Sequence, residues 1–215
     1  LGVTAAIFHI KVSQNSIRID WPVMMGATLL FTLFILDEDP RTLSKWEGIV
    51  FVIALIVFVT WLIRKSRKDE LARAGDQEKF VEGQSHFSTR KIIAYIVAGC
   101  IALALGAELL VNGAVGIAEA MGISERLISL TVIAFGTSVP ELATSIIALV
   151  KRQSDISIGN LIGSNIFNIL GILGVTAIFT EVINKHPLTF SDPDLFYDLW
   201  WMIGISFVAL IFMKS

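Results

Sequence analysis

Leu173-Gly174-Val175-Thr176-Ala177-Ile178-Phe179 nearly repeats the first residues of the chain, Leu1-Gly2-Val3-Thr4-Ala5-Ala6-Ile7-Phe8. The two copies lie 172 residues apart, and each leads through a polar loop into another apolar segment. An internal repeat has to be considered before any other feature, because each copy is one structural unit of a larger architecture. The chain is therefore predicted to contain parts of two related halves.

The composition predicts a membrane protein. Of the 215 residues, 54% are hydrophobic and only 17% are charged, and the mean hydropathy is +0.74. These values lie far from those of a water-soluble domain. They exclude a secreted disulfide scaffold, a nucleic-acid binder and a disordered chain, and the single Cys100 cannot form an intrachain disulfide. We expect an all-α polytopic membrane protein whose partner is the lipid bilayer.

The apolar residues cluster in segments of about 18 to 25 residues, the length that spans the hydrocarbon core. Tryptophans stand near the ends of these segments, where their amphipathic rings favour the headgroup region. The predicted spans are the tail Leu1–Ile10, then Trp21–Leu36, Trp46–Ile63, Ile92–Ala120, Leu127–Val150, Ile156–Phe179 and Leu195–Met213.

The positive charges predict the orientation. If the loops alternate sides, 13 of the 17 Lys and Arg residues fall on one side, which is then cytoplasmic. The acidic loops Asp37-Glu38-Asp39 and Asp192-Pro193-Asp194 face outward. We expect an integral, multi-pass protein, and the short loops favour a prokaryotic inner membrane.

The repeat offset predicts the organisation of the whole protein. Residues 1–63 would be the remainder of a first repeat, 64–91 a cytoplasmic linker, and 92–215 the second repeat. Extending both copies gives a full chain of about 320 residues with ten spans, of which about six and a half are present here. Five spans per half is an odd number, so the halves would cross the membrane in opposite directions. Such inverted repeats are typical of secondary transporters.

The first polar interruption of the apolar spans is Gly136-Thr137-Ser138-Val139-Pro140-Glu141. Pro140 has no N–H and bends or breaks a helix, and the freed carbonyls need a partner in the apolar interior. A cation is a suitable partner. Thr137 and Ser138 lie four and three residues before Glu141, so their oxygens can share its face. An intramembrane carboxylate is costly and typically marks an ion or proton path.

The second interruption is Gly159-Asn160-Leu161-Ile162-Gly163-Ser164-Asn165-Ile166-Phe167-Asn168. Asn160, Ser164 and Asn168 recur every four residues and predict a polar stripe. Gly159 and Gly163 form a small-xxx-small pair, which predicts a close approach to a neighbouring helix. Both interruptions together supply only oxygen ligands, which suit hard cations such as Ca²⁺ or Na⁺.

Other intramembrane polar residues have two readings. Thr144 and Ser145 can belong to the site or can simply bond to the preceding turn. Glu108 can be functional, or pairing and packing near a helix end can explain it. The three histidines are too scattered for a metal cluster.

With these motifs in view, the sequence resembles the cation/Ca²⁺ exchanger superfamily, which comprises the sodium/calcium exchangers and their prokaryotic relatives. The two interruptions are similar to the signature segments of that family's second α-repeat, here residues 134–168. The resemblance implies ten helices in two inverted halves and alternating access of a central site. The positions implied to bind the cation are Glu141, Thr137, Ser138, Ser164 and Asn168, together with the Ala134 carbonyl.

The resemblance predicts a Na⁺/Ca²⁺ antiporter, not an enzyme, with Ca²⁺ and Na⁺ as transported substrates and no cofactor. The first α-repeat, with its own glutamate, is missing from these residues, and it would be the partner that completes the site. Asn168 stands where potassium-dependent members carry an aspartate, which weakens the case for K⁺ co-transport. A Ca²⁺/H⁺ exchanger on the same scaffold and, less favoured, a cation channel remain alternatives.

Overall fold

The computed structural model describes residues 12–36, 41–74, 88–190 and 194–214. Nearly all of these residues are helical. In chain order the elements are η1 (Ser16–Asp20), α2 (Trp21–Leu36), β1 (Thr42–Leu43), α3 (Lys45–Ala74), α4 (Thr89–Ala120), α5 (Glu125–Ile128), η2 (Ser129–Ile133), α6 (Ala134–Thr137), α7 (Val139–Val150), α8 (Ser154–Ile166), η3 (Phe167–Leu173), α9 (Gly174–Asn184), β2 (Leu188–Thr189) and α10 (Leu195–Lys214), where η marks a π-helix.

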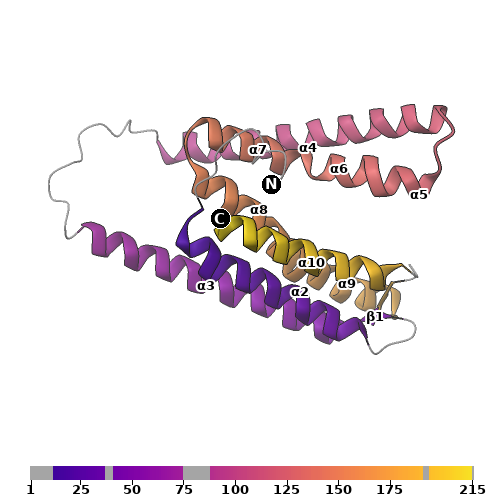
Figure 1. Cartoon of the computed structure of the whole chain (residues 1–215), viewed down its shortest axis with the longest axis horizontal. Coiled ribbons are helices and arrows are strands. Elements are labelled where there is room, and N and C mark those ends of the chain that lie inside the picture. Colours follow the sequence, from indigo (N-terminus) through magenta and orange to yellow (C-terminus); the bar gives the residue numbers. More distant parts are fainter. Residues whose placement is uncertain (1–11, 37–40, 75–87, 191–193, 215) are drawn as a thin grey trace.

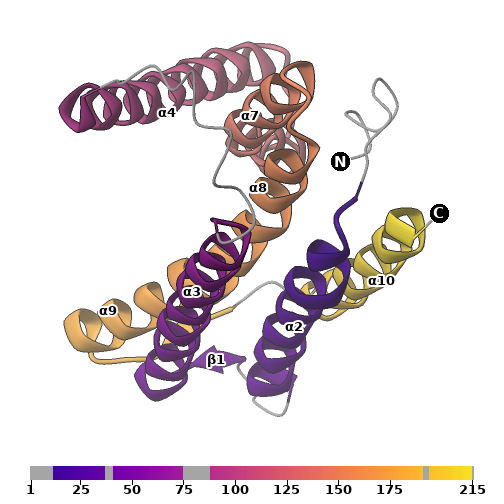
Figure 2. The same ribbon diagram turned by 90° about the vertical axis from the view of Figure 1, so that its left-hand side faces the viewer.

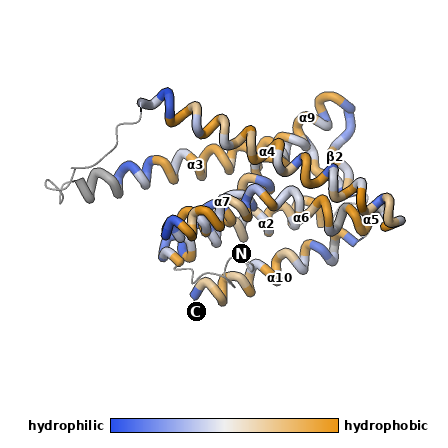
Figure 3. Tube along the Cα trace, turned by 90° about the horizontal axis from the view of Figure 1, so that it is seen from above, coloured by the Kyte–Doolittle hydropathy of each residue, from blue (hydrophilic) through white to orange (hydrophobic). Residues whose placement is uncertain are grey.

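Five helical stretches are long and apolar enough to cross a membrane, and a bent pair makes a sixth. They confirm the prediction of a polytopic all-α protein. The predicted tail Leu1–Ile10, which contains the first copy of the repeated sequence, lies outside the described residues. The stretches are Ser16–Leu36, Lys45–Lys68, Thr89–Ala120, Ile156–Asn184 and Tyr197–Lys214, with the pair Thr131–Thr137 and Val139–Val150. Figure 3 shows the apolar middles of these helices and their more polar ends.

Three helix boundaries lie five or more residues from the predicted spans. The span that was expected to end at Phe179 continues to Asn184. The helix α3 does not end at Ile63 but continues to Ala74, so the first part of the predicted linker is helical. Charged residues with good helix propensity fill this extension, which explains why the helix outlasts its apolar segment. The span that was expected to begin at Trp21 begins at Ser16, so Trp21 lies inside the membrane-spanning helix. Its indole N–H donates to the Ser206 carbonyl of α10 at 2.9 Å.

The helices form two groups joined by α8. Figures 1 and 2 show α2, α3, α9 and α10 on one side and α4 with α5, α6 and α7 on the other. The buried core lies mainly in the first group and in α8, where Ile35, Leu43 and Phe51 are fully buried and Ile158 nearly so. In contrast, no part of the apolar window of α4 is buried within the described chain. This arrangement places α7 and α8 at the junction of the two groups.

A two-stranded sheet joins loops that are far apart in sequence. Strand β1 follows α2 and pairs antiparallel with β2, which follows α9, in the register Thr42 to Thr189 and Leu43 to Leu188. We call this end of the bundle the strand end. The pairing shows that residues 41–43, which follow one predicted external loop, and residues 188–190, which precede the other, lie at the same end of the molecule. The acidic residues 37–39 and 192–193 themselves lie outside the described residues.

Helices α3 and α9 approach each other closely between Gly48, near the start of α3, and Gly174, at the start of α9. A Cβ placed on Gly48 would lie 2.6 Å from the Gly174 carbonyl oxygen, and one on Gly174 would lie 3.0 Å from the Gly48 carbonyl oxygen. Only glycine permits such backbone contact. One of these glycines belongs to the repeated stretch Leu173–Phe179, so this stretch is also a packing element.

Candidate functional site

The helix that contains Pro140 is broken one turn before Glu141. Residues Thr131–Thr137 and Val139–Val150 are bent by 44° with respect to each other, and the break falls at Ser138. Pro140 stands in the first turn of α7, where a missing N–H leaves no intrahelical bond unmade. The predicted interruption is therefore confirmed, and its place is the start of a new helix rather than the middle of a continuous one.

Three predicted oxygens meet at this break. The Ala134 carbonyl accepts the hydroxyl of Thr137 at 3.1 Å and the hydroxyl of Ser138 at 3.1 Å. Thr137 and Ser138 are exposed within the described chain. In an apolar membrane, a group of hydroxyl and carbonyl oxygens at a helix break is suited to replace part of the hydration shell of a cation.

Glu141 lies in the first turn of α7, immediately beyond the break. Its Oε2 is buried and has no hydrogen-bond partner among the described residues. A buried carboxylate oxygen without a partner is unfavourable, because it has lost its water and gained no donor. Glu141 is thus a position where a cation or a proton would relieve an electrostatic cost.

Asn160 connects the two motif helices. Its Nδ2 donates to the Thr144 hydroxyl of α7 at 2.8 Å and lies 3.5 Å from the Glu141 carbonyl oxygen. The Thr144 hydroxyl itself donates to the Pro140 and Glu141 carbonyls, each at 3.0 Å. Thr144 therefore bonds to the preceding turn, as one of its two readings expected, and also receives a bond from α8. The four-residue stripe pointed to Asn160, but no sequence signal identified its partner.

The rest of the predicted stripe, Ser164 and Asn168, is not hydrogen-bonded to the helix break among the described residues. Ser164 donates its hydroxyl to the Leu161 carbonyl one turn earlier, at 3.0 Å. Asn168 is exposed and falls in the π-helix η3, whose wider turns shift it from the α-helical stripe. Within the described chain neither side chain forms a hydrogen bond with α6 or α7.

Among the described residues, no element makes the close approach that Gly159 and Gly163 permit. A Cβ on either glycine would meet no atom of another described element within 4 Å. A close contact occurs instead at Gly136, where a Cβ would collide with Val111 Cγ2 of α4. Small residues permit two helices to approach closely, but the approach occurs only where tertiary packing places a second helix against them.

The sequence pattern of the family described as sodium/calcium exchanger protein matches residues 1–64 and 91–215. This chain belongs to the sodium/calcium exchanger family. The match covers both groups of helices and both motif segments, and leaves out most of the predicted linker.

Several bacterial and archaeal relatives support membership of the exchanger family. The putative antiporter CaxA of Alkalimonas amylolytica is 39% identical over 83% of this chain and 55% of its own length. The inner membrane protein YrbG of Escherichia coli is 28% identical over 100% of this chain and 65% of its own length. The sodium/calcium exchanger MaX1 of Methanosarcina acetivorans is 38% identical over 58% of this chain and 34% of its own length.

Solved structures of the sodium-calcium exchanger NCX_Mj share the fold. The structure soaked with 10 mM Na⁺ and no Ca²⁺ matches with a TM-score of 0.68 and 27% identity, over 100% of this chain and 64% of that one. The structure soaked with 10 mM Na⁺ and 10 mM Sr²⁺ gives a TM-score of 0.70. This exchanger-family chain thus has a multi-pass membrane fold and spans less than two thirds of the proteins it resembles.

Two further polar side chains of this exchanger-family chain, Ser145 and Glu108, form no hydrogen bond with the break among the described residues. Ser145 is buried, and its hydroxyl has no partner among the described residues, whereas Glu108 on α4 is exposed. The described chain contains no group of three His, Cys, Asp or Glu side chains able to hold a metal. A cation here would depend mainly on neutral oxygens, with Glu141 as the carboxylate.

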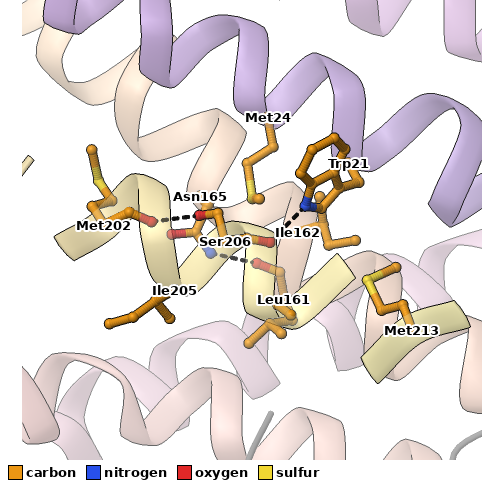
Figure 4. A pocket seen from close by; sticks show the side chains of 10 residues that line it. Trp21, Met24, Leu161, Ile162, Asn165, Met202, Ile205, Ser206 and Met213 are labelled. Atoms are coloured by element: carbon orange, nitrogen blue, oxygen red, sulfur yellow. Dashed lines mark hydrogen bonds between the residues drawn. The ribbon is translucent and has the colours of Figure 1, made fainter. Parts of the chain in front are cut away.

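A separate apolar pocket of about 340 Å³ lies between α2, α8 and α10. Figure 4 shows Trp21, Asn165 and Ser206 with three methionines around it. None of the six predicted cation ligands lines this pocket, and Asn165 uses its amide to donate to the Leu161 carbonyl at 2.8 Å. The pocket is therefore distinct from the candidate cation site.

Proposed function

We propose that the full-length protein is a secondary antiporter that exchanges Na⁺ for Ca²⁺ by alternating access. The cation site would consist of Glu141, Thr137, Ser138, Ser164, Asn168 and the Ala134 carbonyl, completed by the first α-repeat. The observation that carries this proposal is the helix break, where the Ala134, Thr137 and Ser138 oxygens meet one turn before a carboxylate oxygen that is buried without a partner.

The charge of the site explains how exchange would be coupled. Glu141 and an equivalent glutamate of the first α-repeat would neutralise one Ca²⁺ or share several Na⁺. Because both ions need the same oxygens, only one kind can occupy the site at a time. Entry of Na⁺ along its gradient would then drive Ca²⁺ in the opposite direction.

The open side of α8 supports the role of the first α-repeat. Gly163 and Asn168 are exposed in the described chain, and a Cβ on Gly159 or Gly163 would have free space. A polar helix face at membrane depth is costly unless another polar protein surface covers it. An inverted first repeat would place its own polar break against this face.

The test uses full-length protein reconstituted in vesicles of defined ion content. Ca²⁺ uptake should require an outward Na⁺ gradient, and Glu141→Gln should abolish it, because the amide has the same size but no charge. Glu119→Gln at the exposed end of α4 is the matched control and should leave uptake unchanged. Uptake that persists in Glu141→Gln, or that ignores the Na⁺ gradient, would contradict the proposal.

The same experiment separates the alternatives. The unpartnered Oε2 of Glu141 could also hold a proton, so a Ca²⁺/H⁺ exchanger would show uptake driven by a pH gradient without Na⁺. A channel would show Ca²⁺ flux without any counter-ion. We place the protein in a prokaryotic inner membrane, in keeping with the short loops of the chain.

A further inference from the structure

The helix that carries Ser164 and Asn168 is anchored at its far end by Glu181. Glu181 lies in α9 near the strand end, and its Oε2 accepts the backbone N–H of Lys45 at 2.7 Å. Its Oε1 lies 3.2 Å from Nζ of the same lysine. Lys45 is the first residue of α3, so a single carboxylate binds both the start of that helix and its first side chain.

The start of α3 needs this carboxylate. The first N–H groups of a helix lack internal partners, and the positive end of the helix dipole favours an anion there. Glu47 provides one acceptor locally, since its Oε2 accepts the N–H and the hydroxyl of Ser44 at 2.7 and 2.9 Å. The N–H of Lys45 is left for Glu181, which comes from a helix 136 residues further along the chain. These bonds are charge-assisted and fix both distance and direction.

Contacts further along the same two helices leave little freedom for sliding. The backbones of Gly48 and Gly174 touch, and a Cβ on Gly171 of η3 would lie 3.1 Å from the Leu55 side chain of α3. Helix α9 is therefore bound to α3 by the Glu181–Lys45 contact near its C-terminal end, which we call the polar anchor. Steric contacts at Gly174 and Gly171 hold the preceding turns against the same helix. The polar anchor adds a directional, charge-assisted bond to a helix pair that the glycine contacts already hold close.

We propose that Glu181 is a positioning residue for transport, which holds the helix bearing Ser164 and Asn168 at a fixed depth against α3. Elements α8, η3 and α9 follow one another without interruption from Ser154 to Asn184. A shift of this helix at Glu181 would therefore move Asn168, about 20 Å away at 1.5 Å per residue. This inference rests on the proposed function, because it assigns Ser164 and Asn168 to the cation site.

The first test compares two glutamates at the same end of α3 in the reconstituted full-length protein. Glu181→Gln keeps an acceptor for the Lys45 N–H but removes the ion pair. We expect the half-saturating Ca²⁺ concentration to rise roughly two- to fivefold, the size typical of a partly exposed ion pair, with little change in maximal rate. Glu47→Gln removes the same charge within the α3 terminus and should lower only thermal stability. An equal shift in both variants, or none in Glu181→Gln, would overturn the inference.

The second test restores the anchor covalently. Lys45→Cys and Glu181→Cys are combined with Cys100→Ser and treated with a short bis-methanethiosulfonate, which joins two cysteines through disulfides that a reductant cleaves. Cross-linking should bring the half-saturating Ca²⁺ concentration back toward that of the unmodified protein. Uptake that is lost on cross-linking and regained on reduction would show that the helices must move apart, and an absence of cross-linking would show that the contact does not exist in the membrane. Either result would contradict the inference.

Failure of the proposed function would look different. In that case the protein with no substitution would show no Na⁺-dependent Ca²⁺ uptake at all, while cross-linking between positions 45 and 181 would still report whether the contact is present.

Discussion

The Asn160 side-chain amide of α8 donates at 2.8 Å to the hydroxyl of Thr144, which lies one turn after Glu141 in α7. Since Thr144 in turn donates to the Pro140 and Glu141 carbonyls, the first turn of α7 is held by a residue of the next helix. The carboxylate of Glu141 therefore sits on a turn whose position depends on α8.

The hydrogen bond between Asn160 and Thr144 should be visible as coupling between two substitutions. Asn160→Ala and Thr144→Val each remove one partner, so the double variant should be more stable than the sum of the single losses predicts. Interhelical hydrogen bonds in membranes contribute about 0.6 kcal/mol on average, which sets the expected coupling. Thermal unfolding of the purified full-length variants measures it, and strictly additive losses would argue against the bond.

The contact between Gly48 and Gly174 should make either glycine sensitive to a single methyl group. Gly48→Ala would place a Cβ 2.6 Å from a carbonyl oxygen and should cost about 1–3 kcal/mol of stability, as overpacking typically does. Gly204→Ala in α10 is the control, because its Cβ would meet nothing within 4 Å and alanine favours a helix. Melting temperatures in detergent compare the two, and similar values would contradict the packing of α3 on α9.

The contact between Gly136 and Val111 should show complementation of size. Gly136→Ala would direct its Cβ into Val111 and displace either α4 or the broken segment, so Ca²⁺ uptake should fall. Adding Val111→Ala removes the obstructing methyl groups and should restore most of the loss. The measurement is Ca²⁺ uptake by vesicles that contain the single or the double variant. If adding Val111→Ala restores no uptake, α4 and α6 do not form this contact.

The orientation predicted from the positive charges should be accessible to labelling. In a Cys100→Ser background, His186→Cys near the strand end should react with a membrane-impermeant thiol reagent added outside intact cells. Arg152→Cys, in the turn between α7 and α8, should react only after the membrane is opened. Both side chains are exposed, so access depends only on the side of the membrane. The reverse pattern would invert the assigned topology.

Local sequence features predicted the elements of the site. The Ala134 carbonyl was implied only by the resemblance to the exchanger superfamily, but the other elements were predicted from the residues. The apolar length of each segment indicated the spans, and a proline beside a carboxylate indicated a helix break near Pro140 with Thr137 and Ser138 on its face. These properties depend on residues within one or two turns of each other. The predicted ends of the helices were less accurate, because they were taken from hydropathy alone. The extension of α3 to Ala74 depends instead on the helix propensity of charged residues.

The sequence by itself determined that this chain crosses a membrane several times, that it repeats an element, and that a carboxylate lies at a helix break. Only the tertiary structure decided that Asn160 binds Thr144, that Glu181 anchors Lys45, and that Gly48 rather than Gly159 makes the close helix contact. The reason is physical. Hydropathy and proline act through local backbone geometry, whereas a hydrogen bond or a glycine contact between distant residues exists only when packing brings two helices to the right depth and rotation.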